Sequence, residues 1–240
     1  MDMSNTAIKA PSVWLLMREG RAIAEYARLR FGARELLREL PRGDGHPVLV
    51  VPGFGANDRS TRPLRDILER LGYAAHGWGQ GRNLGMNRVI RHHLRALLPA
   101  LHKEHGSRVS LIGWSLGGVF ARELARHQPE NVRRVITLGS PINHRPDATN
   151  VDALYRRLNP AYVPDLEAFR QRCQAPPVPC TAVYSRSDGI VAWQTSLENP
   201  APNTENVEVS GSHLGMGVNP EVIRVIAGRL ALPEPDRAAA

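Results

Sequence analysis

The sequence predicts an α/β protein with a mostly parallel central sheet flanked by helices and a lid or cap insertion. Short apolar runs that suit buried strands alternate with longer patterns that suit helices, which is the order expected of a parallel sheet. The chain has 240 residues, 42% hydrophobic and 22% charged, a composition that argues against disorder and against a coiled coil. We therefore expect one globular domain, and its apolar runs are too short for a transmembrane helix.

The first 45 residues are expected to form a helical segment packed on the main domain, residues 46–240. Over residues 12–40 apolar side chains recur at roughly helical spacing, and Pro41 ends the pattern. These apolar positions are Leu16, Ile23, Ala27, Ala33, Leu37 and Leu40. Because the opposite face is rich in arginine, weak contact with a membrane surface or lipid is the alternative to docking on the domain, which we prefer.

From residue 46 onward, strand and helix patterns follow each other in order. Residues 48–51 form a continuous apolar run, as in a strand that is buried on both faces. The helix expected over residues 61–71 has Ser60 or Thr61 as its N-cap and Gly72 as its stop. The other expected strands are residues 73–78, 108–114, 132–138, 180–185 and 206–209, and the other expected helices are residues 87–105, 116–127 and 220–230.

Residues 142–178 interrupt this alternation, because prolines accumulate there and clear periodicity is lost. A segment of this length without regular structure is uncommon inside a compact domain, so we expect a lid. Its apolar side chains are numerous enough to line an acyl pocket or, alternatively, to pack the lid onto the body. They are Leu154, Tyr155, Leu158, Tyr162, Val163, Leu166 and Phe169.

Charge and cysteine content limit the possible partners. The formal net charge is +8, from 31 Lys and Arg against 23 Asp and Glu, but the arginines are dispersed and not interleaved with aromatic residues. This pattern argues against a nucleic-acid partner.

The N-terminus lacks the apolar core of a signal peptide, so we expect a cytoplasmic protein in which Cys173 and Cys180 are thiols. A bridge between these two cysteines is the alternative for an exported protein, and neither belongs to a Cys/His cluster with metal-binding spacing.

The strongest chemical signal is the stretch GWSLGG at residues 113–118, between an expected strand and an expected helix. This context is typical of a nucleophile elbow, a sharp turn that raises a serine hydroxyl above the sheet. The residues two positions before and after the serine must be small, because larger side chains would collide across the turn. Ser115 is therefore the candidate nucleophile, and the alternative is a purely structural turn.

A serine hydroxyl needs a base to take its proton, and the base needs an acid to orient it. After an elbow of this kind, the acid and then the base are expected downstream. His213 is the candidate base, because it follows a late strand in a loop rich in Gly and Ser. Asp188 is the candidate acid, because it follows the expected strand 180–185, although an Asp-Gly pair also suits an ordinary turn.

The tetrahedral intermediate of acyl transfer needs two hydrogen-bond donors for its oxyanion. The backbone N–H of Leu116, directly after the nucleophile, is one candidate. The N–H of Phe54 is the other, since Phe54 lies between glycines after the first buried strand, whereas Pro52 has no N–H to donate.

Four stretches in this order, residues 48–55, 113–118, 187–191 and 211–216, resemble the α/β-hydrolase family, nearest to its small bacterial esterases and lipases. The resemblance frames residues 46–230 and implies hydrolysis of carboxylic esters without a metal or organic cofactor. It also implies the roles given above to Ser115, Asp188 and His213. One departure is Pro52, where many lipases have a histidine, and this weakens the resemblance to true lipases in particular.

The expected function is a serine hydrolase that cleaves small-molecule carboxylic esters through an acyl-enzyme. An acyltransferase or a thioesterase with the same triad is the main alternative, and a non-catalytic receptor with this fold is a weaker one. The candidate substrate contacts are Trp114, Arg82 and Asn83. Arg82 could meet a substrate carboxylate or phosphate, but a plain loop arginine and an asparagine that bonds the local backbone are the preferred interpretation.

Overall fold

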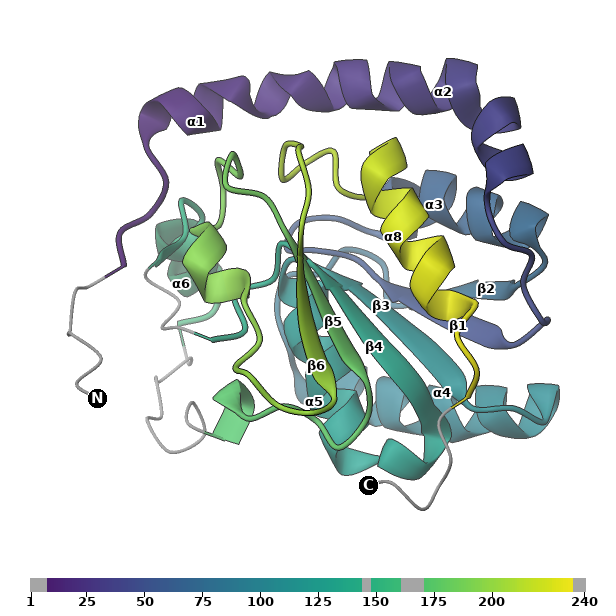
Figure 1. The fold of residues 1–240 in the computed structure, drawn as a ribbon. Coiled ribbons are helices and arrows are strands. Elements are labelled where there is room, and N and C mark those ends of the chain that lie inside the picture. The colour runs from purple at the N-terminus through teal and green to yellow at the C-terminus, as the bar shows by residue number, and fades with distance from the viewer. Residues whose placement is uncertain (1–7, 144–147, 161–170, 235–240) are drawn as a thin grey trace.

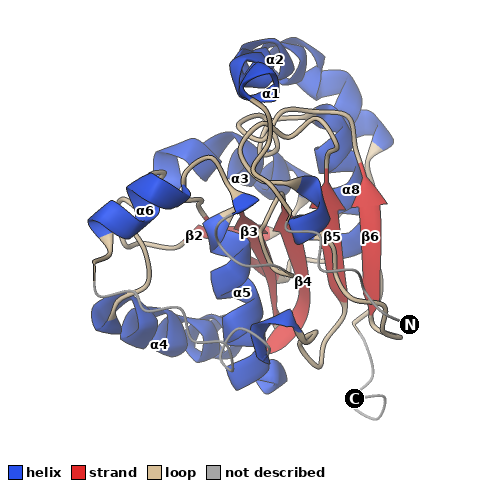
Figure 2. Ribbon diagram, turned by 90° about the vertical axis from the view of Figure 1, so that its left-hand side faces the viewer, coloured by secondary structure: helices blue, strands red, loops and turns tan. Residues whose placement is uncertain are grey.

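The computed structural model describes residues 8–143, 148–160 and 171–234. Its centre is a six-stranded sheet with the strand order β2-β1-β3-β4-β5-β6, and every neighbouring pair of these strands is parallel (Figure 1). The strands are β1 (Pro47–Val51), β2 (Ala74–Gly77), β3 (Val109–Trp114), β4 (Val132–Leu138), β5 (Cys180–Tyr184) and β6 (Thr204–Glu208). Helices cover both faces of the sheet (Figure 2), so the expected α/β class is confirmed.

Strand β1 shows why a continuous apolar run forms the middle of this sheet. All five of its residues are buried, and successive side chains of a strand point to opposite faces. Val48 and Val50 pack into a hydrophobic cluster on one face, whereas Leu49 and Val51 pack into a second cluster on the other. Both faces need apolar side chains because both are covered by helices.

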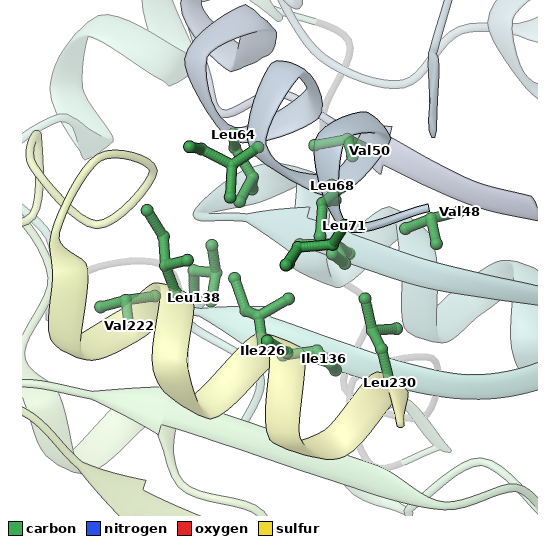
Figure 3. Packing of buried hydrophobic residues seen from close by; sticks show 14 of the residues in the cluster. Val48, Val50, Leu64, Leu68, Leu71, Ile136, Leu138, Val222, Ile226 and Leu230 are labelled. Carbon is green, nitrogen blue, oxygen red and sulfur yellow. The ribbon is translucent and has the colours of Figure 1, made fainter. Parts of the chain in front are cut away.

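The first cluster lies between the sheet and three helices, α2 (Ala22–Glu39), α3 (Asp58–Leu71) and α8 (Pro220–Leu230). Leu64 and Leu68 of α3 and Ile226 and Leu230 of α8 point into this cluster (Figure 3). Each of these side chains is almost fully buried, and full burial of one Leu or Ile contributes about 1.5–3 kcal/mol. This cluster joins the N-terminal and C-terminal helices to the same face of the sheet.

The second cluster lies beneath α4 (Arg88–His105) and α5 (Leu116–His127). Leu94 and Leu98, one helical turn apart on α4, are fully buried together with Leu111 of β3. Helix α4 ends at Gly106 in the left-handed conformation, as the sequence predicts. The helix that carries the elbow, α5, is therefore fixed against the sheet by a continuous apolar layer.

Helix α3 begins earlier than the sequence predicts. Its N-cap is Asn57, whose side chain accepts a hydrogen bond from the N–H of Arg59, so the prediction of Ser60 or Thr61 as N-cap is wrong. Ser60 instead accepts a bond from the N–H of Asn57, which completes a capping box. The predicted stop at Gly72 is confirmed, with φ at 104°.

The N-terminal segment is helical, but only the later part of its predicted apolar face is buried, where Leu40 is buried and Ala33 and Leu37 pack against the core. It consists of α1 (Val13–Met17), one 3-10 turn (Arg18–Arg21) and α2, which together form a long arm along the top of Figure 1. Leu16 and Ile23 are exposed, so the apolar face expected from the spacing is wrong at these positions. The buried positions are Glu19, Glu25, Leu29, Leu36 and Leu40. Two of these five are carboxylates, which apolar spacing cannot identify.

The outer face of the N-terminal arm carries large exposed apolar side chains, among them Trp14, Met17 and Phe31. Contact of this face with a membrane surface stays a prediction. No helix in the described parts of the chain combines the length and apolar character needed to cross a membrane.

The insertion over residues 142–178 is described in part. It contains α6 (Asp152–Leu158) and an antiparallel bridge between Thr149 and Val191, whereas residues 144–147 and 161–170 lie outside the described residues. The ring of Tyr155 on α6 meets the ring of Phe54 edge-on at 5.4 Å between centroids. Part of the insertion thus lies against the loop after β1, and its role as a lid stays a prediction.

Cys173 and Cys180 are free thiols, as expected, and are not joined by the alternative disulfide. Cys180 is buried in β5, and burial raises the pKa of its thiol. This thiol is therefore kept in its neutral, unreactive form.

Candidate active site

Strand β3 ends and helix α5 begins at a sharp turn centred on Ser115. Ser115 has φ 53° and ψ −122°, and it is the one non-glycine residue with positive φ in the described parts of the chain. A conformation of this kind costs on the order of 1–3 kcal/mol and persists only where surrounding contacts enforce it. Here the N–H of Ser115 donates to the carbonyl of Leu138 in β4 at 2.8 Å, and the Ser115 carbonyl accepts from Gly118 at 3.0 Å.

The glycines two positions before and two positions after Ser115 are required by space. A Cβ on Gly113 would lie 2.3 Å from the Cα of Gly118, and one on Gly117 would lie 2.2 Å from the Val51 carbonyl oxygen. These atoms belong to the backbone and cannot move aside. The predicted requirement for small neighbours of the serine therefore has a specific cause: strands β1 and β3 and the start of α5 meet with no room for a methyl group.

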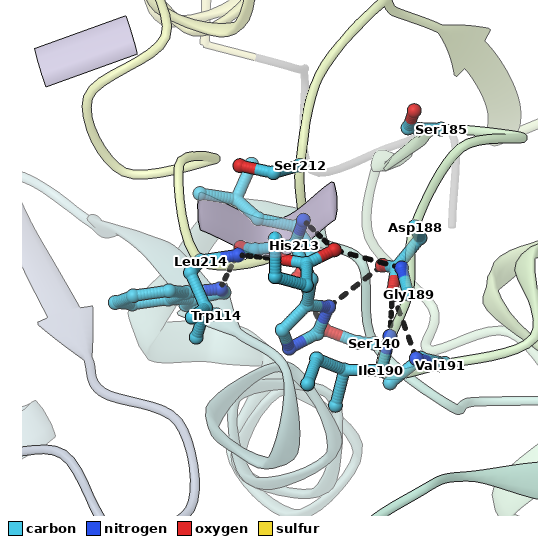
Figure 4. Close-up of polar contacts among 12 residues, drawn as sticks. Trp114, Ser140, Ser185, Asp188, Gly189, Ile190, Val191, Ser212, His213 and Leu214 are labelled. Atoms are coloured by element: carbon cyan, nitrogen blue, oxygen red, sulfur yellow. Dashed lines mark hydrogen bonds and ion pairs between the residues drawn. The ribbon is translucent and has the colours of Figure 1, made fainter. Parts of the chain in front are cut away.

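Asp188 and His213 form a buried pair. The Nδ1 of His213 lies 2.6 Å from Oδ2 of Asp188, and both residues are almost fully buried (Figure 4). The other carboxylate oxygen of Asp188 accepts the backbone N–H groups of Ile190 and Val191, each at 2.8 Å. These two bonds fix the orientation of the carboxylate. Since Nδ1 is directed at Asp188, Nε2 is the nitrogen of His213 left to act on a serine.

The environment of His213 favours its protonated form. Burial alone would lower the pKa of the imidazole, but the carboxylates of Asp188 and Glu19 outweigh burial and raise that pKa above its usual value. A base that must hold a proton during the reaction benefits from this arrangement.

Trp114 links the serine turn to the histidine loop. Its indole Nε1–H donates to the carbonyl of His213 at 3.1 Å, and the two rings lie 6.3 Å apart between centroids. This bond supports the His213 loop, and contact of Trp114 with substrate stays a prediction. Because Trp114 directly precedes Ser115, this contact brings Ser115 and His213 to the same edge of the sheet.

Gly139, which follows β4, shows how closely the parts of the site approach one another. A Cβ on Gly139 would lie 3.0 Å from both Oδ2 of Asp188 and Nδ1 of His213. Leu138, the residue before it, accepts the N–H of Ser115. The carboxyl ends of β3, β4 and β5 thus converge on one place, where ligands gather in parallel sheets.

The loop after β1 passes directly beside Ser115. A Cβ on Gly53 would lie 3.1 Å from the Ser115 Cβ, a tight contact that glycine avoids. Phe54 and Leu116, the expected oxyanion donors, line the same cavity as Ser115. Both residues thus lie beside Ser115, and their role as oxyanion donors stays a prediction.

Asn83 has a different position from the one expected of a substrate contact. It is fully buried, and its amide donates to the carbonyl of Pro52 at 2.8 Å and accepts from the N–H of Gly85 at 3.2 Å. Its backbone also bonds Gly55 and Ala56. Asn83 therefore fixes the loop after β1 and does not face substrate, which agrees with the alternative that it bonds the local backbone.

Arg82 is exposed and does not line the cavity at Ser115. It lines a separate hollow of about 380 Å³ near the start of α4, together with Leu158 and Asn159. The prediction that Arg82 meets substrate is not supported by this position, and a plain loop arginine describes it better.

The cavity at Ser115 has a volume of about 460 Å³. Its apolar lining comes from α4, α5 and the insertion and includes Leu94, Val119, Phe120, Ile142 and Val151. Arginines also line it, namely Arg91, Arg95, Arg122, Arg126 and Arg172. Pockets of this size and mixed character are typical of sites for small organic ligands.

The sequence interpretation missed Glu19, Arg21 and Glu25 of the N-terminal arm. All three side chains bond the backbone of the loops that carry Asp188 and His213. One signal was present in the sequence, because Glu25, Leu29 and Leu36 follow each other at helical spacing. A carboxylate in line with apolar positions indicates a polar partner on the buried side.

Residues 48–177, more than half of the chain, match the family model described as alpha/beta hydrolase fold. A pimeloyl-[acyl-carrier protein] methyl ester esterase of Shewanella oneidensis is 29% identical over 98 residues, which cover 41% of this chain and 36% of that protein. The protein of the same name from Photobacterium profundum is 24% identical over 179 residues, 70% of this chain and 66% of that protein.

Two solved structures show the same architecture. The mature lipase of Bacillus licheniformis has a TM-score of 0.61 and 18% identity, covering 81% of this chain and 95% of that one. The monoacylglycerol lipase of Paleococcus ferrophilus has a TM-score of 0.54 and 16% identity, covering 80% and 96%. With the family match, they confirm the resemblance seen in the sequence: the chain belongs to the α/β-hydrolase fold family.

Proposed function

We propose that the protein is a serine hydrolase that cleaves carboxylic esters, with Ser115 as nucleophile, His213 as base and Asp188 as the acid that orients it. The observation that carries this proposal is the buried Asp188–His213 pair at the edge of the sheet where the strained Ser115 turn lies. A buried carboxylate and imidazole beside a nucleophile elbow are the parts that acyl transfer requires.

The reaction follows from these positions. Nε2 of His213 takes the Ser115 hydroxyl proton while Oγ attacks the ester carbonyl carbon. The resulting oxyanion is held by the backbone N–H groups of Phe54 and Leu116. The C–O bond to the alcohol then breaks, and His213 donates its proton to the departing oxygen. Water, deprotonated by the same imidazole, then attacks the acyl-enzyme carbonyl, the bond from the acyl carbon to Oγ breaks, and His213 returns the proton to Ser115 as the acid is released.

The cavity supports an acyl group longer than acetyl. Its lining is largely apolar around α5 and the insertion, and its volume of about 460 Å³ exceeds what a two-carbon acyl group fills. The curated relatives are named for methyl esters of a pimeloyl group on a carrier protein. Esters of medium-length acyl chains are therefore the substrates that we propose.

The test is hydrolysis of a p-nitrophenyl ester series from acetate to palmitate by wild type and Ser115→Ala. Ser107→Ala, at the opposite end of β3 from the site, is the matched control. We expect release of p-nitrophenol that peaks beyond acetate, is lost in Ser115→Ala and is retained in Ser107→Ala. Full activity in Ser115→Ala would refute the proposed nucleophile.

Two further substrate conditions separate the alternatives. A methyl ester of a carrier-bound acyl group tests the substrate named for the relatives, and an acyl thioester tests thioesterase activity. Added alcohol reveals a transferase, because a transferase forms a new ester in place of the free acid. Preference for thioester, or accumulation of the new ester, would replace the hydrolase assignment while keeping the triad.

A further inference from the structure

The geometry points to Glu19, on the N-terminal arm, as a positioning residue that holds the loops of Asp188 and His213 in register for catalysis. This inference rests on the proposed function, since it assigns a role within the same site. It gives the N-terminal arm, which lies outside the main domain expected from the sequence, an indirect part in catalysis through the loops of Asp188 and His213.

The carboxylate of Glu19 binds both loops at once. Its Oε1 accepts the N–H of Gly189 at 2.7 Å and the N–H of His213 at 3.0 Å, and its Oε2 accepts the N–H of Leu214 at 2.8 Å. Gly189 directly follows the acid, and His213 is the base itself (Figure 4). Glu19 is almost fully buried, so these bonds are shielded from competing water.

The backbone of the arm also lies directly on the acid loop. A Cβ on Gly189 would lie 2.4 Å from the carbonyl oxygen of Leu15 and 2.8 Å from the Cα of Leu16. The glycine after Asp188 is therefore needed for the arm to approach, and not only for an Asp-Gly turn. Because the backbone of the arm lies this close to Gly189, the Glu19 carboxylate can reach between the two loops.

Two neighbouring side chains of the arm reinforce the same loops. Glu25 accepts the backbone N–H of Ser212 at 2.9 Å and its hydroxyl at 2.7 Å. One nitrogen of Arg21 donates to the carbonyls of Ser187 at 3.0 Å and Gly211 at 3.3 Å. The arm thus bonds residues on either side of both Asp188 and His213.

The charges around the imidazole complete the argument. Asp188 faces His213 from the loop after β5, and Glu19 faces it from the arm, while Glu25 and Arg21 bond the backbone beside it. Replacing the Glu19 carboxylate by an amide keeps its size but removes one negative charge and one acceptor oxygen. We therefore expect the change to disturb both the position and the protonation of His213.

The experiment compares wild type with Glu19→Gln and with Glu35→Gln, the same change at an exposed position of α2. Each protein is assayed for kcat, KM, the pH profile of kcat/KM and thermal unfolding. We expect Glu19→Gln to lower kcat about tenfold to a hundredfold, as misplaced catalytic groups do. KM should stay within about twofold, because the acyl cavity is untouched. The acid limb of the profile should move to lower pH, and Glu35→Gln should match wild type.

Wild-type kcat and an unchanged acid limb in Glu19→Gln would overturn the proposal, as would a loss confined to thermal stability. If Glu19→Gln does not fold, Glu19→Asp, which keeps the charge and withdraws the carboxylate by one methylene, is judged by its loss of kcat.

An NMR titration of the His213 imidazole in a Ser115→Ala background gives a readout that does not depend on turnover. We expect a lower pKa of His213 when Glu19→Gln is added, and an unchanged pKa would overturn the role of Glu19. If wild type cleaves no ester, the proposed function fails, and this titration still decides whether Glu19 acts on His213.

Discussion

At the Ser115 turn, the shape of the site is set by residues close to it in sequence and by the strands on either side. The glycines at 113, 117 and 118 leave no space for a methyl group, and the strained serine follows from that packing. At the Asp188 and His213 loops, by contrast, the backbone is held by side chains of the N-terminal arm, which bond Gly189 across 170 residues of sequence and Leu214 across 195. One half of the site is a local motif, and the other depends on a remote element.

This difference predicts how each half of the site responds to mutation. The elbow should fail completely when its packing is violated, because backbone atoms block an added group at Gly113 and Gly117. The Asp188 and His213 loops should lose their position only in part when one contact is removed, because several independent hydrogen bonds hold them.

The largest effect is expected from Gly117→Ala. The new Cβ would lie 2.2 Å from the Val51 carbonyl oxygen and 2.7 Å from that of Pro52, so β1 or α5 must move. We expect loss of soluble folded protein or a drop in stability of at least about 3 kcal/mol, measured by urea unfolding.

Gly228→Ala in α8 is the matched control, because no atom lies within 4 Å of the added methyl group. Alanine in a helix is favoured over glycine by about 1 kcal/mol, so this variant should be at least as stable as wild type. A normal Gly117→Ala protein would show that the elbow is not set by packing.

The next effect concerns the anchoring of α5 behind the elbow. Arg122 on α5 and Glu198 form a buried ion pair at 2.6 Å between Nη2 and Oε2. Glu198→Ala leaves the guanidinium buried without its carboxylate, which typically costs about 3–5 kcal/mol. We expect a lower free energy of unfolding with kcat kept at temperatures where the variant is folded.

Glu39→Ala, which removes the exposed pair with Arg224, is the control and should change stability little. A large loss of kcat in folded Glu198→Ala would mean that the Ser115 turn also depends on a remote contact, which would contradict its description as a local motif.

A moderate effect is expected from pH, and it should act on activity and stability in opposite directions. The folded-state pKa of His213 is raised, because the carboxylates of Asp188 and Glu19 outweigh burial. The imidazole must be neutral to act as base, so kcat/KM should rise through a pKa above the usual value of about 6.5. The stabilisation from the bound proton is full below the unfolded-state pKa and is lost as pH rises through the folded-state pKa.

Measurements of kcat/KM and melting temperature from about pH 5 to 9 check this prediction. The difference in melting temperature between wild type and His213→Gln should shrink as pH rises. A difference that grows with pH would contradict the raised pKa.

The smallest effect is expected from Asn219→Ala, which removes the N-cap of α8 beside the His213 loop. The Asn219 side chain accepts from the N–H of Glu221 and donates to the carbonyl of Ser210, at 2.8 and 2.7 Å. Loss of an N-cap costs about 1 kcal/mol, and we expect a slight loss of kcat as well.

Asn87→Ala removes the N-cap of α4, away from that loop, and should lower stability similarly with kcat unchanged. Equal kcat in the two variants would show that the cap of α8 does not support the base.

The sequence was most informative where the structure is set locally. The strand before Ser115, the helix after it and the glycines between them could be predicted, because one turn geometry requires all of them. Asp188 and His213 could be placed by their order after strands, since parallel strands bring their carboxyl ends together.

Remote contacts could not be predicted in this way. Glu19 is an ordinary helical residue until the fold brings Gly189 and His213 to it, and nothing in its own neighbourhood indicates those partners. Asn83 looked like a loop residue that could face substrate, but its amide is used inside the loop after β1. The prediction for the N-terminal arm was wrong at Leu16 and Ile23 for the same reason, because the side of the arm that is buried there carries the carboxylates of Glu19 and Glu25.

The most direct test of the account is labelling with a fluorophosphonate, followed by mass mapping of the modified peptide. A serine reacts readily with this reagent only when a neighbouring base activates it. We expect a single adduct on Ser115, absent in Ser115→Ala and much slower to form in His213→Gln. An adduct on another residue, or labelling of Ser115 at an equal rate without His213, would contradict the proposed site.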